Sequence, residues 1–136
     1  MLPEITKVGA IIREVAAREV LPRFQNLSDA EIREKNSGDI VTIADERAES
    51  ALDKRLREII PGSCVVGEEG AARDPSSMNV LEGSDPVWII DPVDGTQNFA
   101  DGNPCFAMII AFVRGSETLA GWIYEPYRGH MIHAVK

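Results

Sequence analysis

Two cysteines are all that this sequence of 136 residues contains, and their setting is apolar. Cys64 and Cys105 lack the CxxC or Cys/His spacing of a zinc site or a redox motif. We therefore expect both to be small buried thiols in a reducing compartment, and neither a disulfide nor a zinc site.

Long apolar runs are also missing. No stretch reaches the roughly 18 to 20 residues that cross a bilayer, and residues 1–15 mix Glu, Lys and Arg among their apolar positions, as signal peptides do not. Basic residues are few: 14 Lys and Arg stand against 22 Asp and Glu, a net charge of -8. This balance disfavours binding to nucleic acid or anionic membrane and is compatible with bound cations. We expect a cytoplasmic protein.

The residues that are present suit a single globular domain, because 44% are hydrophobic and 26% are charged. Apolar spacing predicts a first helix from Ile5 to about Val20, which Pro22 stops or kinks. A second helical pattern reaches Ile59, with Thr42 as N-cap and Asp45 in its first turn. The segment 23–35 between the helices has no clear period.

Short runs rich in Val, Ile, Phe and Trp follow and are typical of strands: CVVG, VWIID, CFAMIIAFV, LAGWIY and HMIHAV. RGSET (114–118) and EPYRG (125–129) predict hairpin connections, so the last three strands should form an antiparallel meander. Polar residues over 71–85 predict a long surface loop. The fold class is therefore α+β, a large and mostly antiparallel sheet with two helices packed on one face. Nothing in the sequence supplies a layer for the other face.

The stretch DPVDG lies at the end of the second predicted strand and contains several oxygen atoms that could bind a cation. Asp91 lies at the strand end, and Pro92 is expected to turn the chain so that Asp94 and the Val93 carbonyl approach the same point. Converging carboxylates repel one another unless a proton or a cation lies between them. Carboxylate and carbonyl oxygens suit Mg²⁺ or Mn²⁺ far better than zinc. Taken alone, however, the fragment is also ordinary turn chemistry.

Further groups lie beside this predicted cation site. Gly95 permits close approach of the backbone, and if a helical turn begins at Thr96, its free N–H groups point toward the site and can hold a phosphate. CVVG is followed by Glu68 and Glu69, which on an extended chain point to opposite faces. One glutamate can then bind a cation while the other orients water, although an exposed acid pair before a loop fits as well.

Three motifs together resemble the inositol monophosphatase family of Mg²⁺-dependent, lithium-sensitive phosphatases. They are GEE at 67–69, WIIDPVDGTQNF at 88–99 and DIVTIAD at 39–45. The long motif, with its spacing from GEE, is highly specific, and the resemblance runs over the whole chain. It implies hydrolysis of a phosphomonoester by water activated at two or three Mg²⁺ ions, with Mn²⁺ as a substitute.

The resemblance also implies roles for individual residues. The metal ligands are Glu68, Asp91, the carbonyl of Val93 and Asp94, with Asp91 bridging two cations. Thr96 and Asp45 position the attacking water, Glu69 takes a supporting catalytic role, and the N–H groups of Gly95 and Thr96 hold the phosphate. Lys35 and the turn over 36–38 resemble a mobile loop that closes over the metals; a solvated loop fits nearly as well.

Family members have a second half, whose W-D-x-A-A/G motif completes the metal site. We therefore expect residues 1–136 to be the N-terminal, metal-binding half of an αβαβα layered fold, from a longer chain or a naturally short relative. An inositol phosphate is the expected substrate. Histidinol phosphate, fructose 1,6-bisphosphate and 3'-phosphoadenosine nucleotides are alternatives, as is an accessory role bound to the transcription machinery. The family also leads us to expect a homodimer.

Overall fold

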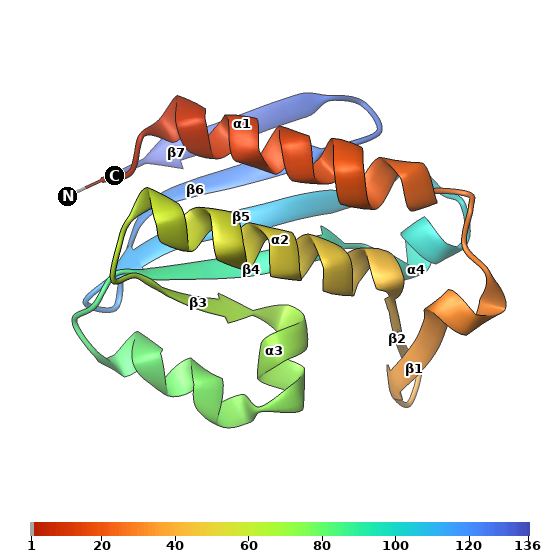
Figure 1. Cartoon of the computed structure of the whole chain (residues 1–136), viewed down its shortest axis with the longest axis horizontal. Coiled ribbons are helices and arrows are strands. Elements are labelled where there is room, and N and C mark those ends of the chain that lie inside the picture. The colour runs from red at the N-terminus through yellow and green to blue at the C-terminus, as the bar shows by residue number, and fades with distance from the viewer. Residues whose placement is uncertain (1) are drawn as a thin grey trace.

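The structure, a computed structural model, describes residues 2–136. It contains one five-stranded sheet with helices α1 (Ile5–Val15) and α2 (Ile43–Ile59) lying across the same face (Figure 1). The strands, in their order across the sheet, are β3 (Cys64–Gly67), β4 (Val87–Asp94), β5 (Ala107–Arg114), β6 (Glu117–Glu125) and β7 (His130–Val135). Only β3 and β4 are parallel, and the other neighbours are antiparallel. The expected α+β class and the final meander are confirmed.

The core lies between the two helices and the sheet. Val8, Ile12 and Val15 of α1 are buried because they recur at helical spacing on one side of that helix. Trp88 of β4 and Trp122 of β6 fill the space beneath, with their ring centroids 6.0 Å apart. Each indole N–H has a partner, Ser63 Oγ for Trp88 and the Ile5 carbonyl for Trp122. This core fixes β4 against the helices up to the point where its acids begin.

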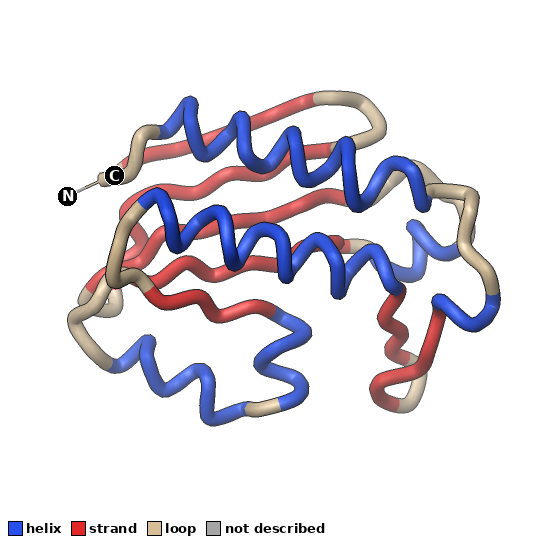
Figure 2. Tube along the Cα trace, viewed as in Figure 1, coloured by secondary structure: helices blue, strands red, loops and turns tan. Residues whose placement is uncertain are grey.

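The opposite face of the sheet is apolar and partly exposed. Ile109, Ile123 and Ile132 lie side by side on neighbouring strands, since Ile109 pairs with Ile123 and Ile123 with Ile132. Ile123 is 45% exposed and Ile132 is 66% exposed. Figure 2 shows both long helices on the other side of these strands. The chain therefore buries one face of the sheet and leaves part of the other open.

Two segments that we expected to lack regular structure, 23–35 and 71–85, contain regular elements, whereas the turn expected over 36–38 is present. Residues 32–42 form a hairpin of β1 (Ile32–Asn36) and β2 (Asp39–Thr42), which turns at Gly38 with a φ of 74°. The expected surface loop over 71–85 contains the end of α3 (Glu68–Arg73) and a 3-10 helix over Pro75–Glu82. Both predictions were wrong because these elements are short and lack the repeated apolar spacing that identifies longer ones.

Other details refine the expectations. The first helix continues past α1 as a π-helical turn over Ala16–Val20, and Pro22 then lies in a 3-10 turn that ends it. Cys64 is half-buried, but Cys105 is exposed, which corrects the prediction of two buried thiols. Its apolar run begins in the connection before β5, so the first residue of the run never enters the sheet. None of the helices within residues 2–136 is both long enough and apolar enough to span a membrane.

Candidate active site

Strand β4 carries its two acids at its carboxyl end. Ile90 is buried under the helices, and Asp91 follows it, opposite Ile109 of β5. The pairing with β5 then shifts, because Asp94 pairs with Ala107. Pro92 therefore lies in an irregular part of the strand, where its missing N–H is tolerated, and not in the sharp turn that we expected. The bulge leaves Asp91 and Asp94 lining one cavity.

The chain turns at Gly95, three residues after Pro92, where we expected the turn. Gly95 has a φ of 89°, and a Cβ there would approach the Cys105 carbonyl oxygen to 3.0 Å, so a side chain is excluded by both conformation and space. Helix α4 (Thr96–Ala100) begins directly afterwards, as the sequence predicted. The turn places Thr96 beside the carbonyl of Val93.

Asp45 and Thr96 are brought together from distant parts of the sequence. The Thr96 hydroxyl lies 2.9 Å from Asp45 Oδ1 and 2.9 Å from the Val93 carbonyl oxygen, and its single proton can go to only one of them. Asp45 Oδ2 accepts from both the N–H and the hydroxyl of Thr42, so the expected N-cap also fixes the Asp45 side chain. Burial raises the pKa of Asp45, and the hydrogen bonds from Thr42 and Thr96 oppose this shift.

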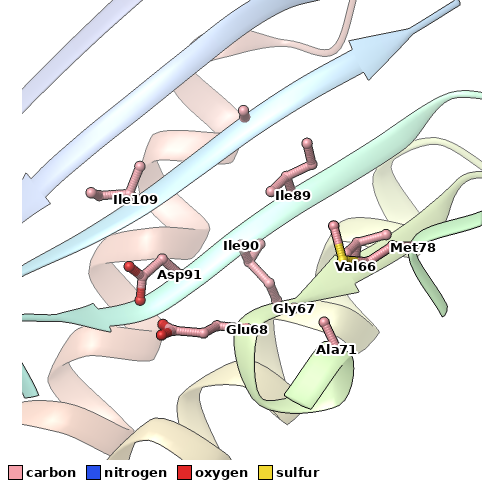
Figure 3. Close-up of a pocket in the computed structure, with 10 residues that line it drawn as sticks. Val66, Gly67, Glu68, Ala71, Met78, Ile89, Ile90, Asp91 and Ile109 are labelled. Atoms are coloured by element: carbon pink, nitrogen blue, oxygen red, sulfur yellow. The ribbon is translucent and has the colours of Figure 1, made fainter. Parts of the chain in front are cut away.

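Glu68 and Asp91 face each other across the ends of β3 and β4. Figure 3 shows their carboxylates pointing toward one another. Burial, the contact with Glu68 and the charges of Glu68, Asp94 and Asp45 raise the pKa of Asp91 to about 8. Asp91 Oδ1 is buried and has no hydrogen-bond partner among the described residues. A carboxylate oxygen left in this state is where a cation would be stabilised.

Glu68 and Glu69 begin helix α3 and do not extend strand β3, so the reason we gave for their different directions was wrong. They nevertheless diverge, since the Glu68 side chain is 46% exposed and that of Glu69 is 4% exposed. Lys35 of β1 reaches between them, with its Nζ 2.8 Å from Glu69 Oε1 and 3.5 Å from Glu68 Oε1. Burial disfavours the Lys35 charge, but its bond to Glu69 and the nearby acids outweigh this and raise the pKa of Lys35.

One cavity of about 240 Å³ gathers most of the predicted site residues: Glu68, Asp91, Val93, Asp94, Gly95 and Thr96. Asp45 reaches this cavity through Thr96. Glu69 lines a separate cavity with Lys35 and Arg73. The residues that line the first cavity were therefore predicted from sequence. Lys35, which lines the second cavity, was predicted only as part of a loop.

Glu49, a buried acid one helical turn after Asp45 on α2, is not among the residues predicted for the site. Its two carboxylate oxygens accept hydrogen bonds from the backbone N–H groups of Glu69 and Gly70. Burial raises the pKa of Glu49, against those two bonds. The available signal was the spacing of four residues from Asp45, which puts both acids on one side of the helix.

Among residues 2–136, no group of three or more His, Cys, Asp or Glu side chains is already arranged to hold a metal ion. The donors still fit a hard divalent cation. Glu68, Asp91 and Asp94 offer carboxylate oxygens, Val93 adds a carbonyl, and Asp91 Oδ1 lacks any other partner.

Sequence comparison links the chain to relatives about twice its length. It is 32% identical to a fructose-1,6-bisphosphatase/inositol-1-monophosphatase of Aquifex aeolicus, over 91% of this chain and 43% of that protein. It is 31% identical to the Nus factor SuhB of Vibrio cholerae, over 88% of this chain and 42% of that protein. The chain therefore spans less than half the length of these relatives.

Structural and family comparisons agree. The fold resembles that of the Thermotoga maritima IMPase with a TM-score of 0.77 at 28% identity, covering 96% of this chain and 47% of that one. The model of the inositol monophosphatase family matches residues 2–136, which is nearly the whole chain. This chain therefore belongs to the inositol monophosphatase family.

Proposed function

We propose that this chain supplies the metal-binding half of a Mg²⁺-dependent phosphomonoesterase. The observation that carries the proposal is the convergence of Glu68, Asp91, Asp94 and Thr96 on one acidic cavity, in a chain of this family. Glu68, Asp91, Asp94 and the Val93 carbonyl would hold the Mg²⁺ ions, two or three in number, and Mn²⁺ would serve as a substitute. When bound, the ions supply Lewis acidity that activates water and neutralises the charge of a phosphate.

The chain's own contribution to the reaction lies in Thr96 and Asp45. When Asp45 is ionised, its Oδ1 is a stronger acceptor for the Thr96 proton than the neutral Val93 carbonyl is. When the proton is held there, the Val93 carbonyl is free for a cation and a lone pair of the Thr96 hydroxyl is free to accept a hydrogen bond from water. The pair then orients the attacking water. Gly95 and Thr96 line the same cavity, and we assign their N–H groups to the phosphate. We assign Glu69 a supporting catalytic role. The hydrogen bond that Lys35 donates to it restrains the Glu69 carboxylate.

The substrate that we favour is an inositol phosphate. Support comes from the family match and from the Aquifex aeolicus relative, a fructose-1,6-bisphosphatase/inositol-1-monophosphatase, which also makes fructose 1,6-bisphosphate a candidate. Histidinol phosphate and 3'-phosphoadenosine nucleotides stay as alternatives within the same chemistry. Inhibition by lithium is expected for the complete enzyme, since the family resemblance implies it.

A second half of the fold is part of this proposal. The relatives extend well beyond the matched region, and the apolar row of Ile109, Ile123 and Ile132 is partly open. We propose that the second half covers this face and completes the metal and substrate sites. Residues 1–136 alone should therefore bind metal weakly and turn over little substrate.

An accessory role in transcription is the second candidate function. It rests on the relatives named Nus factor SuhB, of which the one from Vibrio cholerae is 31% identical. In that case the partner is a protein, because the net charge of -8 disfavours direct contact with nucleic acid. The two roles separate if Asp91→Asn abolishes phosphatase activity in the full-length protein but leaves its cellular phenotype unchanged.

The proposal extends to the oligomeric state and the cellular location of the protein. We propose a homodimer, as the family resemblance implies, and sedimentation of the chain at several concentrations tests it. We also propose a cytoplasmic location, because both cysteines are free thiols and a reducing compartment preserves them.

Calorimetric titration of Mn²⁺ and Mg²⁺ into the chain tests the proposal. We expect binding by the wild type and its loss in Asp91→Asn, while the control Asp101→Asn, an exposed acid outside the cavity, keeps it. Phosphate release from inositol 1-phosphate, measured in the same buffer, should be negligible for this chain. Wild-type protein that binds neither cation contradicts the proposal, and turnover by the chain alone contradicts the need for a second half.

A further inference from the structure

Glu49 is a buried acid that touches no part of the cation cavity and yet contacts the helix that carries Glu68. It is 7% exposed. Its Oε1 accepts from the N–H of Glu69 and its Oε2 accepts from the N–H of Gly70, both at 2.8 Å. These are the second and third residues of α3, whose first N–H groups have no partner within the helix. Glu49 thus caps α3 from a different element.

Gly67, the last residue of β3, leaves the space that this carboxylate occupies. A Cβ at Gly67 would lie 2.2 Å from Glu49 Cδ and 2.5 Å from each of its carboxylate oxygens. The backbone itself does not require glycine, because its φ of -106° and ψ of 154° suit any residue. The absent side chain is therefore needed for space, and the space is occupied by Glu49.

Helix α2 reaches two parts of the site with residues one turn apart. Asp45 binds the Thr96 hydroxyl, and Glu49, four residues later, binds the start of α3. Both side chains are almost completely buried, so neither is free to choose another partner. The distance between Thr96 and Glu68 is thereby set through one rigid helix.

We propose that Glu49 is a positioning residue, which holds the metal ligand Glu68 in place by capping α3 across the space left by Gly67. The inference rests on the proposed function, because it treats Glu68 as a metal ligand. Glu49 itself binds no metal and no substrate. Its loss should loosen the start of α3 and let the Glu68 carboxylate turn away from Asp91, while the core between helices and sheet stays packed.

Glu49→Gln is the main test, because glutamine has the same size but offers one acceptor oxygen and one NH₂ group to two N–H donors. We expect Mn²⁺ affinity to fall by about 10- to 100-fold, as for other residues that support a metal ligand. Glu46→Gln is the matched control, since Glu46 lies on the same helix in an exposed ion pair with Arg33. It should bind Mn²⁺ as the wild type does. Near-ultraviolet circular dichroism at the titration temperature checks that each variant is folded.

A double-mutant cycle separates positioning from general damage. Gly67→Ala should weaken Mn²⁺ binding because the new methyl group displaces the Glu49 carboxylate. In the Glu49→Ala background that space is empty, so adding Gly67→Ala should change the affinity little further. Additive losses would mean that Gly67 acts independently of Glu49.

The outcomes distinguish this inference from the proposed function. Wild-type protein that binds no Mn²⁺ overturns the proposed function and this inference with it. Wild-type binding that Glu49→Gln retains, or that Glu46→Gln loses equally, overturns the inference alone. Loss confined to Glu49→Gln, with non-additive effects at Gly67, supports the assignment.

Discussion

Asp91 is partly buried and has like-charged neighbours. Its charge therefore lowers the free energy of unfolding of the metal-free chain. Replacing it with asparagine removes the charge and lets an amide donate to Glu68. We expect Asp91→Asn to raise the free energy of unfolding at pH 8 without metal by about 1 kcal/mol, since solvent screens this partly exposed cluster. Urea denaturation in a chelating buffer measures it. Asp101→Asn should stay within about 0.5 kcal/mol of the wild type. A clear loss of stability in Asp91→Asn contradicts this view of the site.

Thr96 is tied to stability in the opposite sense. Thr96→Val keeps the shape of the side chain but leaves Asp45 Oδ1, a buried oxygen, without its hydroxyl donor. An unsatisfied buried acceptor costs about 1 to 3 kcal/mol, and we expect a loss of that size in urea denaturation. Thr96→Ser retains the donor and should lose much less. Equal stability of the valine and serine variants would show that Asp45 Oδ1 does not depend on the Thr96 hydroxyl for its hydrogen bond.

At the scale of elements, the N-cap of α2 supports both fold and site. The Thr42 hydroxyl accepts from the Ala44 N–H and lies against Asp45 Oδ2, so one residue caps the helix and orients its first acid. Thr42→Ala should cost about 1 to 2 kcal/mol in thermal or urea unfolding, the range for a lost N-cap. Thr42→Ser preserves the hydroxyl and serves as control. A fully stable alanine variant would mean that tertiary packing alone holds this end of α2.

The elements also show what was predictable from sequence. The long helices and all five strands of the main sheet were identified correctly, because each buries an apolar pattern that the sequence alone displays. The β1–β2 hairpin and α3 were missed because tertiary contacts hold them, as when Lys35 of β1 reaches Glu69 of α3. Local residue patterns carry no record of such contacts.

Some residues of the candidate site could likewise be predicted from the sequence, and others could not. Asp91, Val93 and Asp94 were identifiable because they lie within four residues at a strand end, where chain geometry alone brings them near. The roles of Glu49 and Lys35 depend on approaches between residues 20 and 34 positions apart in the sequence. Only the folded chain reveals them, because burial and partners decide what an acid does.

For the whole molecule, buried acids predict a dependence of stability on pH. The pKa of Asp91 is raised from 3.8 to about 8, and those of Asp45, Glu49 and Glu69 are raised as well, chiefly by burial. Such groups bind more protons in the folded state, so the free energy of unfolding falls as pH rises between the unfolded and folded values. We expect the metal-free chain to be more stable at about pH 6 than at about pH 8 in urea denaturation.

The Asp91→Asn variant provides the control for this pH dependence. Because the pKa of Asp91 is raised to about 8, its removal should flatten the profile between about pH 6 and 8 in particular. Lys35 has a raised pKa, so it stays charged over this window and adds no slope there. A wild-type profile that rises toward pH 8 would mean that the carboxylates are already separated and hydrated in the metal-free chain.

The two faces of the sheet should respond differently to the same substitution. Ile110 faces the helices and is fully buried, whereas Ile123 on the neighbouring strand faces the open side and is 45% exposed. Ile110→Thr should therefore cost about 2 kcal/mol or more, because it places a hydroxyl in a packed core. Ile123→Thr should change stability by less than about 0.5 kcal/mol and reduce the binding of a dye that fluoresces on apolar surfaces. If Ile123→Thr instead destabilises the isolated chain as strongly as Ile110→Thr does, this face is already covered in solution, for example by a second copy of the chain. The row of isoleucines would then not be the surface that the second half of the fold covers.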